Sequence, residues 1–383
     1  METNKKVGII TLFHNNVNYG GMLQSFALTK YINSLGYDCE QITTDFISSN
    51  DIKLIGSGKG LKSLLKSAVK YVIYLFIKNK LSDRRRAFLY FEEIVPHSST
   101  VYNRENINNT NVIYDYFITG SDQVWNMSWY KPEYFLSFVK NKPKISYAAS
   151  MPTSFSDKNN IIIAEHLKDF TNISVREQEL VDIISKLSNK KVSHTVDSTL
   201  LLSKDEWDEI CDDRIIEEPY LICYFLSSNK SIRKTVTKFA KKKKIKIVIL
   251  PHVGGINVSD CFFGDMKLFD ISPSQFLSLI KYADYILTDS FHASVFSCIY
   301  DKPFVVFSRR GAESMNSRIH TLLKLYGKND RFVSDITDIS QLENKLDNCL
   351  PDDDFLLQNA INESKIFIRK SLLLPEEEKN ENR

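Results

Sequence analysis

The chain has 383 residues, of which 43% are hydrophobic and 25% charged, a composition typical of a folded globular protein. A chain of this length exceeds one ordinary hydrophobic core, so we expect two α/β domains. The net charge of +3 gives no indication of a nucleic-acid-binding protein. No apolar run is long enough to span a bilayer and no signal peptide precedes the first strand, so we expect a cytoplasmic location.

The six cysteines are scattered through the chain, and no two of them form a Cys-x-x-Cys pair. Most stand in apolar surroundings, which indicates reduced core thiols of the kind found in the cytosol. No Cys/His cluster has the spacing of metal ligands, so we predict no metal site.

The first predicted strand and helix enclose a polar loop with two adjacent glycines. Residues 7–12 predict a buried strand, and residues 22–35 carry apolar side chains at helical spacing. The loop between them holds Asn18, Tyr19, Gly20 and Gly21. Paired glycines let backbone N–H groups approach a ligand beside a helix start, but a tight turn without a ligand also favours them. Both interpretations stay open for this loop.

Residues 59–90 differ in pattern from the rest of the first half. Lysines recur near one helical face and aliphatic side chains fill much of the rest, so we predict a basic amphipathic helix inserted in the first domain. Such a helix can lie on an anionic membrane surface. The alternative is a helix that packs on the domain and keeps its lysines in water.

Three more buried strands are predicted in the first half, over residues 116–119, 144–149 and 172–175. Polar side chains follow these strands: Ser121, Asp122 and Gln123, then Ser150, then Arg176. Because parallel strands end at one edge of a sheet, we expect these side chains to line one crevice. Arg176 either clamps a carboxylate or phosphate of a ligand in two-point fashion or forms a salt bridge with a neighbouring glutamate.

The second half repeats the alternation and predicts a second Rossmann-like domain. The expected strands cover residues 220–226, 245–251, 285–288 and 303–308. The expected helices cover residues 231–240, 272–282, 291–300 and a segment from 316, with a solvated turn over 241–244. Ser272 and Gln275 form a capping box with Pro273 at the first helical position. The chain therefore divides into residues 1–214, 215–350 and 351–383, and the last helix, about 354–372, is expected to pack back across the first domain.

His292 lies where the strand over residues 285–288 passes into the following helix. Asp289 and Ser290 separate the two elements. Ligands of open α/β sheets bind at this edge, and the positive end of a helix attracts anions. Histidine is also the side chain that exchanges protons most readily near neutral pH. We therefore predict a functional site at His292.

Three arginines fall on strand–helix turns adjacent to that of His292: Arg309, Arg310 and Arg318. Such clustering favours an anionic ligand, because guanidinium groups match carboxylates and phosphates in geometry. The alternative is that the arginines pair with acidic residues of the protein surface.

Several motifs, taken in their order along the chain, resemble the polysaccharide pyruvyl transferase family over about residues 5–335. The motifs are Asn18-Tyr-Gly-Gly-Met-Leu-Gln-Ser-Phe-Ala-Leu, Gly120-Ser-Asp-Gln-Val-Trp, Ser174-Val-Arg-Glu, Asp197-Ser-Thr-Leu-Leu, Thr288-Asp-Ser-Phe-His-Ala and Arg318-Ile. The resemblance implies two Rossmann-like domains that face a cleft, as in GT-B glycosyltransferases, with the acceptor on the first domain and the donor on the second. It also implies transfer of a pyruvate group from phosphoenolpyruvate to a sugar of a surface polysaccharide or glycan precursor, usually as a cyclic ketal and without a cofactor.

The resemblance also assigns roles to single residues. His292 matches the family histidine that is taken as the general acid or base, and Arg176 matches an arginine that contacts the donor. Ser290 departs from the pattern, because some members have an arginine two residues before that histidine. Phosphoenolpyruvate carries a carboxylate and a phosphate, which need several fixed cations. The missing charge is therefore expected from Arg309, Arg310 or Arg318.

The acceptor is expected to be a sugar or a lipid-linked oligosaccharide, which agrees with a peripheral contact of the basic helix at the inner membrane face. Two other functions stay open: a GT-B glycosyltransferase that uses a nucleotide sugar, and a non-catalytic binding member of a polysaccharide assembly complex. No acidic motif that would hold a ribose follows the glycine-rich helix, which disfavours the former, and the retained Arg176 and His292 disfavour the latter. The oligomeric state does not follow from the sequence.

Overall fold

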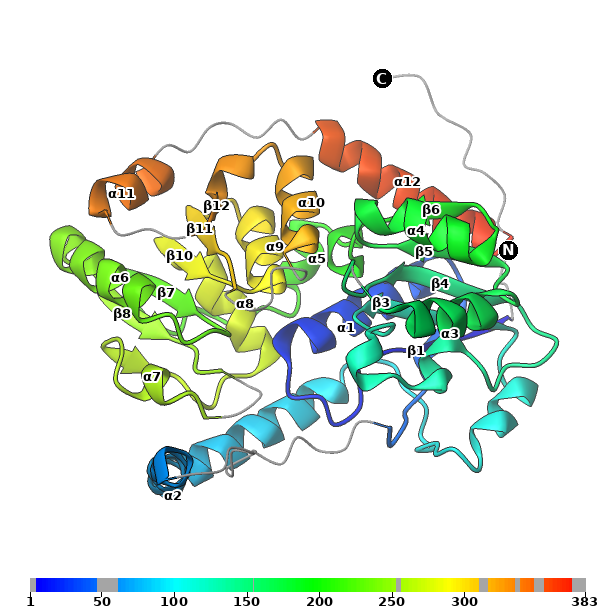
Figure 1. The fold of residues 1–383 in the computed structure, drawn as a ribbon, viewed down its shortest axis with the longest axis horizontal. Coiled ribbons are helices and arrows are strands. Elements are labelled where there is room, and N and C mark those ends of the chain that lie inside the picture. The colour runs from blue at the N-terminus through cyan, green and yellow to red at the C-terminus, as the bar shows by residue number, and fades with distance from the viewer. Residues whose placement is uncertain are drawn as a thin grey trace.

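The computed structural model of the protein describes residues 5–46, 61–153, 155–252, 256–309, 316–334, 338–347 and 355–373, with side chains of the helix over 61–92 described from residue 67. It contains two six-stranded sheets, and every strand pairing within them is parallel. Helices cover the sheets, and the two sheets lie in separate halves of the molecule (Figure 1). This arrangement confirms the predicted α/β fold of two Rossmann-like domains.

The first sheet has the strand order β2-β1-β3-β4-β5-β6. Its strands are β1 (Lys6–Ile10), β2 (Asp38–Gln41), β3 (Tyr116–Asp122), β4 (Lys144–Ala149), β5 (Asn172–Val175) and β6 (Val192–His194). The helices of this half are α1 (Tyr19–Ser34), α2 (Leu61–Glu92), α3 (Asp157–Leu167) and α4 (Gln178–Ser188). Strands β3 and β4 are buried along their whole length, as is usual for central strands of a parallel sheet covered on both faces.

The second sheet has the strand order β12-β11-β10-β7-β8-β9. Its strands are β7 (Tyr220–Tyr224), β8 (Lys246–Ile249), β9 (Met266–Lys267), β10 (Tyr285–Thr288), β11 (Phe304–Phe307) and β12 (Phe332–Val333). Its helices are α6 (Lys230–Lys243), α7 (Val258–Cys261), α8 (Pro273–Lys281), α9 (Phe291–Ile299), α10 (Ser317–Leu325) and α11 (Ile339–Asp347). The 3₁₀ turn η4 (Ser198–Leu201) and α5 (Lys204–Asp208) connect the two sheets.

Several predicted boundaries differ from the structure, and helix capping explains the two that lie at the ends of helices α1 and α6. Helix α1 begins at Tyr19 rather than at residue 22, because the Asn18 side chain accepts a hydrogen bond from the Gly21 N–H. Helix α6 continues to Lys243 rather than ending before a turn. Lysines in a last turn interact favourably with the helix dipole, and Lys244 in the left-handed conformation ends the helix. The predicted capping box of Ser272 is confirmed.

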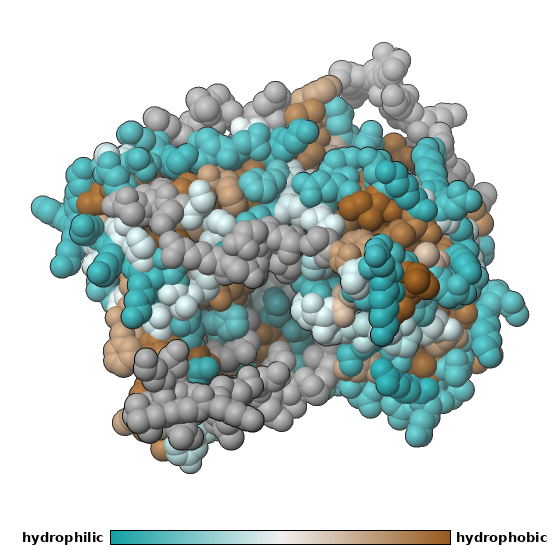
Figure 2. Space-filling model, in the orientation of Figure 1, coloured by the Kyte–Doolittle hydropathy of each residue, from teal (hydrophilic) through white to brown (hydrophobic). Residues whose placement is uncertain are grey.

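The two domains share one apolar core instead of meeting through water. The ring of Tyr19 stacks on Phe276 of α8 at a centroid distance of 4.6 Å, and Trp207 meets Phe296 of α9 edge to face. Figure 2 shows the surface hollowed between the two domains. A cleft therefore lies between the two domains, and aromatic contacts join the domains beneath it.

Helix α12 (Phe355–Ser371) follows the second domain but lies against the first (Figure 1). The Val196 N–H donates a hydrogen bond to Ser364 Oγ, and the Tyr37 hydroxyl donates to the Leu372 carbonyl. These contacts tie the C-terminal helix to elements more than a hundred residues earlier in the chain, as expected for a helix without a following strand.

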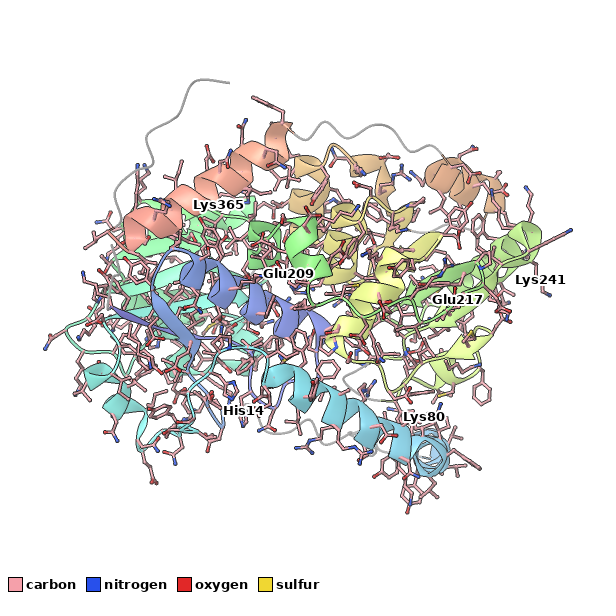
Figure 3. All side chains as sticks on the ribbon, turned by 180° about the vertical axis from the view of Figure 1, so that it is seen from behind. His14, Lys80, Glu209, Glu217, Lys241 and Lys365 are labelled. Carbon is pink, nitrogen blue, oxygen red and sulfur yellow. The ribbon has the colours of Figure 1, made fainter. Side chains whose placement is uncertain are left out.

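Helix α2 has two halves with opposite surroundings. Phe88 and Phe91 near its end are buried in the core, at 3% and 1% exposure. Its middle exposes large apolar side chains: Val69, Tyr71, Val72, Leu75 and Phe76, the last at 85%. Figures 1 and 3 show α2 running along one side of both domains, with Lys80 on its projecting part. In the described part of the chain, no helix is both long and apolar enough to cross a membrane.

Candidate active site

His292 occupies the first turn of α9, which follows the carboxyl end of the central strand β10 of the second sheet. Ser290 is the N-cap residue of this helix, and its side chain accepts from the Ala293 N–H at 3.5 Å. The carboxylate of Asp289 accepts hydrogen bonds from the N–H groups of Leu226 and Ser227, at 2.6 and 2.9 Å. Asp289 thus joins the turns after β7 and β10, which makes it a positioning residue for the α9 start.

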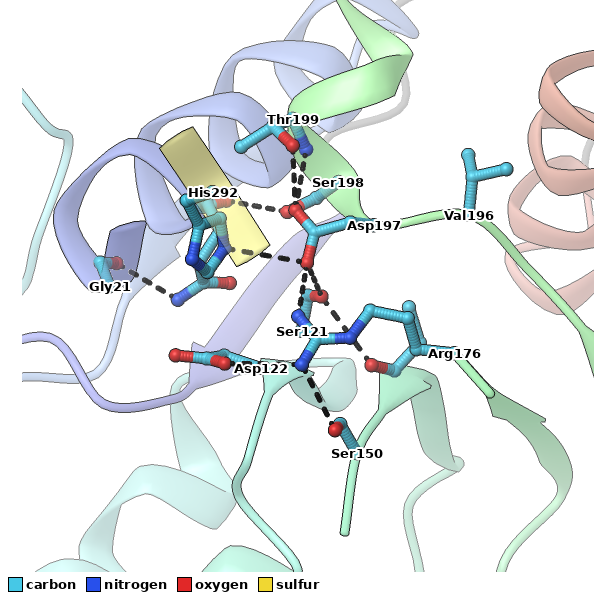
Figure 4. Close-up of polar contacts among 12 residues, drawn as sticks. Gly21, Ser121, Asp122, Ser150, Arg176, Val196, Asp197, Ser198, Thr199 and His292 are labelled. Atoms are coloured by element: carbon cyan, nitrogen blue, oxygen red, sulfur yellow. Dashed lines mark hydrogen bonds and ion pairs between the residues drawn. The ribbon is translucent and has the colours of Figure 1, made fainter. Parts of the chain in front are cut away.

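Asp197 of the first domain is the acidic partner of His292 (Figure 4). The distance from His292 Nε2 to Asp197 Oδ2 is 3.6 Å, which is the range of an ion pair but beyond a hydrogen bond. Both residues are buried, with exposures of 8% and 1%. An imidazole beside a buried carboxylate is an arrangement suited to proton transfer, because the carboxylate orients the ring and stabilises its charged form.

The Asp197 carboxylate is held by four groups of the first domain. Thr199 donates to Oδ1 from its hydroxyl at 2.7 Å and from its backbone N–H at 3.1 Å. Ser121 Oγ donates to Oδ2 at 3.0 Å, and Arg176 Nη1 donates to the same atom at 2.5 Å. Burial alone would raise the pKa of Asp197, but His292, Arg176 and Thr199 lower it well below its usual value. Asp197 therefore stays ionised.

The two adjacent glycines let α1 approach the imidazole of His292. A Cβ atom added to Gly20 would lie 1.9 Å from His292 Nδ1, a distance that no real contact reaches. A Cβ on Gly21 would lie 2.4 Å from Asn16 Nδ2. Both glycines belong to the first helical turn, so the tight-turn interpretation of the loop is wrong, and Gly20 is required by contact with His292. Tyr19 beside them is fully enclosed by aromatic rings.

Arg176 is engaged by carboxylates of the protein itself. It is 3% exposed and donates from Nη1 to Asp197, and from Nη2 to Asp122 at 3.3 Å and to Ser150 at 3.0 Å. Burial would lower the pKa of Arg176, but Asp197, Glu177 and Asp122 raise it. Of the two predicted roles, the structure shows a salt bridge, formed with two aspartates in addition to the expected neighbouring glutamate, whose Oε1 lies 3.5 Å from Nε.

The Ser121–Gln123 segment forms the wall beside this network. Gly120 has a φ of 110°, and a Cβ there would lie 2.1 Å from the Tyr147 carbonyl oxygen, so only glycine fits. This backbone path turns Ser121 and Asp122 toward Arg176 and Asp197 (Figure 4). Gln123 is also buried, at 8% exposure.

Arg318 is a buried cation without a carboxylate partner. It lies at the start of α10, is 8% exposed and makes no hydrogen bond or ion pair with a residue that the structure describes. Its guanidinium carbon lies 5.7 Å from the ring centroid of Phe291, which Arg176 approaches to 4.4 Å. Burial, together with Arg176 and Arg309, lowers the pKa of Arg318 to about 9. A bound anion would relieve this repulsion, so Arg318 is the best-placed anion ligand beside His292.

The other two predicted arginines differ from Arg318. Arg309 Nε donates to the Asp289 carbonyl at 3.0 Å and lies 3.9 Å from its carboxylate, with 18% of its side chain exposed. Arg310 lies outside the described residues. The structure thus brings Arg176, Arg309 and Arg318 together around the α9 start.

Asp197 and Glu177 complete the site beside Ser150; Ser150 was expected to line the crevice, but prediction from the sequence did not include Asp197 or Glu177 among the site residues. Both acids belong to motifs quoted above: Glu177 lies two residues after β5, and Asp197 lies three residues after β6. An acidic residue shortly after the end of a strand, at the same sheet edge as Arg176, is the sequence signal that would have identified both.

Comparisons with known proteins place the chain in a family and relate its fold to solved structures. The family model for polysaccharide pyruvyl transferase matches residues 18–311. Among solved structures, S. aureus MnaA in its co-structure with UDP superposes with a TM-score of 0.53 at 11% identity, covering 100% of both chains. UDP-GlcNAc 2-epimerase from Methanocaldococcus jannaschii, in complex with UDP-GlcNAc and UDP, also gives 0.53 at 11% identity, covering 96% of this chain and 99% of that one.

Identities this low show a shared fold alone, which is the GT-B-like arrangement of two Rossmann-like domains around a cleft. No curated protein sequence matches the chain significantly. The family match includes the glycine pair, the Arg176 and Asp197 motifs and the His292 turn within one alignment. The chain belongs to the polysaccharide pyruvyl transferase family, a family of transferases.

Proposed function

We propose that this protein transfers a pyruvate group from phosphoenolpyruvate to two hydroxyls of a sugar and forms a cyclic ketal. The observation that carries the proposal is the pairing of His292 and Asp197 next to the unpaired cation Arg318. A proton-transfer group and an anion ligand are the two elements that this reaction needs from a protein. The family match supports the transferase class.

Phosphoenolpyruvate presents a carboxylate and a phosphate on one small molecule. Arg318 is available for one of these groups, because it makes no hydrogen bond or ion pair with a described residue. Arg176 acts indirectly, because its donors already hold Asp197 and Asp122 in place. In this proposal Arg318, at the start of α10, supplies the positive charge that some family members carry at the position of Ser290.

The chemistry divides into two additions. A proton supplied by His292 to the methylene carbon of the donor produces an oxocarbenium-like centre, to which the first sugar hydroxyl adds and returns its proton to the base. The carbon–phosphate oxygen bond then breaks, the second hydroxyl adds, and its proton leaves with the phosphate. The products are one ketal and one inorganic phosphate. The Asp197 carboxylate stabilises the imidazolium between these steps.

A phosphate-release assay tests the proposal. The purified protein is incubated with phosphoenolpyruvate and a broad panel of sugar, nucleotide-linked and lipid-linked acceptors. We expect phosphate release that depends on an acceptor with two neighbouring hydroxyls. Absence of release with every acceptor, combined with thermal stabilisation by a nucleotide sugar and not by phosphoenolpyruvate, would contradict it and favour a glycosyltransferase.

Replacing Arg318 with alanine should weaken phosphoenolpyruvate binding by about 10- to 100-fold, because one charge-assisted hydrogen bond contributes about 1.5–3 kcal/mol. Lysine at this position should restore little, since it lacks the planar two-point donor. Calorimetric titration of the donor measures the change. Lys324→Ala, an exposed residue of the same helix, is the matched control. Equal donor affinity in Arg318→Ala and the control would remove Arg318 from the donor site.

We also propose that the exposed middle of α2 docks on an anionic lipid surface, where a lipid-linked acceptor would be found. Residues 61–82 contain five lysines and no acidic residue, so the helix complements negative headgroups. Tyr71, Val72 and Phe76 are more than half exposed and would enter the boundary between headgroups and acyl chains. The alternative, a helix that packs on the domain and keeps its lysines in water, is supported by its last turns, where Phe88 and Phe91 are buried.

Changing Lys70, Lys78 and Lys80 to glutamate should abolish binding to vesicles that contain phosphatidylserine, since each lysine near such a surface contributes about 1 kcal/mol. Co-sedimentation at low salt measures binding. The matched control changes three exposed lysines of α6 to glutamate, Lys234, Lys238 and Lys241, with the same change in net charge. Equal loss in both variants, or no vesicle binding by the wild type, would contradict the docking proposal.

A further inference from the structure

Arg84 is a buried arginine that the site around His292 does not use. It is 4% exposed, whereas its neighbours Arg85 and Arg86 face outward on α2. Its Nε atom has no hydrogen-bond partner, and Arg84 forms no hydrogen bond or ion pair with any residue that the structure describes. Burying an unpaired charge is unfavourable, so a cation retained in this position indicates a site for a ligand of opposite charge.

The groups around Arg84 belong to the edge of the second sheet where its strands end. Tyr224 is the last residue of β7, and both Arg309 and Arg84 act against the burial that raises its pKa. His252 follows β8 by three residues, and burial, Arg309 and Arg84 lower its pKa while Asp289 acts in the opposite direction.

Contacts place the three groups at the same sheet edge: the ring of Tyr19 lies 5.1 Å from Phe88, one helical turn after Arg84, and 5.8 Å from Tyr224. Arg309 donates to Asp289, whose carboxylate accepts from the turn after β7, and His252 follows β8, the parallel neighbour of β7. Arg84, Arg309 and His252 therefore lie around the end of β7, although they come from three distant parts of the chain.

Two carboxylates also face this region, and neither neutralises Arg84. Asp270 acts on the pKa of Arg84 only after burial and the two tyrosines Tyr19 and Tyr224. Asp289 is already engaged by two backbone N–H groups and by Arg309. The positive charge at Arg84 is thus left without a close partner among the described residues.

Arg309 acts electrostatically on groups of both this region and the site of His292. It contributes to lowering the pKa of Arg318 and that of His252. Arg318 and Arg84 are the two buried arginines near Arg309 that lack a carboxylate partner among the described residues. Two unpaired buried cations match two anionic groups rather than one.

We propose that Arg84, Arg309 and His252 form a phosphate subsite, separate from the His292 site, that binds the phosphate or diphosphate group of the acceptor. The assignment to the acceptor rests on the proposed pyruvyl transfer, in which Arg318 serves the donor. Sugars carried by a nucleotide or a lipid are joined to it through such phosphates. Arg84 lies eight residues, about 12 Å along the helix axis, from the exposed Phe76, so α2 connects the proposed lipid-facing surface with this subsite.

Calorimetric titration with inorganic diphosphate tests the subsite on the full chain, with and without saturating phosphoenolpyruvate. The wild type should bind diphosphate in both conditions. Arg84→Gln and Arg309→Gln should weaken it by about tenfold or more, the loss of one charge-assisted hydrogen bond. Arg85→Gln, on the outer face of α2, is the matched control and should bind as the wild type does. Uridine diphosphate and farnesyl diphosphate then separate a nucleotide source from a lipid source by which of them binds more tightly than inorganic diphosphate.

The inference would be overturned if the wild type did not bind diphosphate, or if Arg84→Gln bound it as tightly as Arg85→Gln. It would also be overturned if phosphoenolpyruvate displaced diphosphate, since the region would then be part of the donor site. Melting curves establish that each variant is folded, and the partly exposed Arg309 supplies a second variant if Arg84→Gln is not. Titration without phosphoenolpyruvate keeps the result independent of the donor, so failure of the subsite and failure of pyruvyl transfer remain distinguishable.

Discussion

Replacing His292 with glutamine should lower turnover by about 10²–10⁴-fold, the usual contribution of a positioned acid–base group. The expected loss follows from its place between the two domains, next to the ionised Asp197 and against Gly20. Glutamine keeps much of the ring's volume and hydrogen-bonding capacity but cannot exchange a proton near neutral pH. Donor affinity should change much less than turnover, because the proposed anion ligands are arginines.

The matched control is His320→Gln, an exposed histidine of α10 that should retain wild-type turnover. Steady-state rates of phosphate release and donor titrations of the two variants give the comparison. If His292→Gln turned over at nearly the wild-type rate while remaining folded, His292 would not be the acid–base group.

Replacing Asp197 with asparagine should lower the free energy of unfolding by about 3–5 kcal/mol, the effect of removing one partner from a buried ion pair. The variant leaves Arg176 buried with Asp122 at 3.3 Å as its nearest remaining aspartate. Activity should fall as well, because His292 loses its carboxylate. Denaturant unfolding at neutral pH measures the first effect, and Asp182→Asn, an exposed residue of α4, should show almost none.

The effect of Asp197 should also depend on pH in a defined direction. Because its folded pKa is lowered, its contribution to stability is present above the ordinary aspartate pKa of about 4 and is lost as the pH falls below that value. The difference in unfolding free energy between wild type and Asp197→Asn should therefore be largest at neutral pH and shrink in acid. A difference that did not change with pH would show that the carboxylate charge is not what stabilises the site.

The sequence predicted the strands that are buried on both faces and the turns that follow them. β4, β5 and β10 have the predicted bounds, because apolar residues followed at once by Ser150, Arg176 and Asp289 mark where each strand ends. His292 could be located for the same reason, since it stands at a strand–helix boundary. Short edge strands such as β9 and β12, with two residues each, carry too little pattern to be predicted.

Contacts between distant segments were the part that the sequence could not show. Arg176 pairs with Asp197 and Asp122, and these three residues follow or end three different strands. A local sequence pattern does not indicate which acidic residue an arginine contacts in the fold. The role of Gly20 depends on a histidine that follows it by more than two hundred residues. Arg84, Arg85 and Arg86 are three consecutive arginines in the sequence, and only burial in the structure distinguishes Arg84 from the other two.

A crystal structure of the protein soaked with phosphoenolpyruvate tests the central claim most directly. We predict the donor in the cleft between the two sheets, with its carboxylate or phosphate within hydrogen-bond distance of Arg318 and its methylene carbon facing the imidazole of His292. Asp197 should keep its contacts with Arg176 and Ser121 in that complex. A donor bound away from Arg318 and His292, or a cleft that takes up a nucleotide sugar but no phosphoenolpyruvate, would contradict the account.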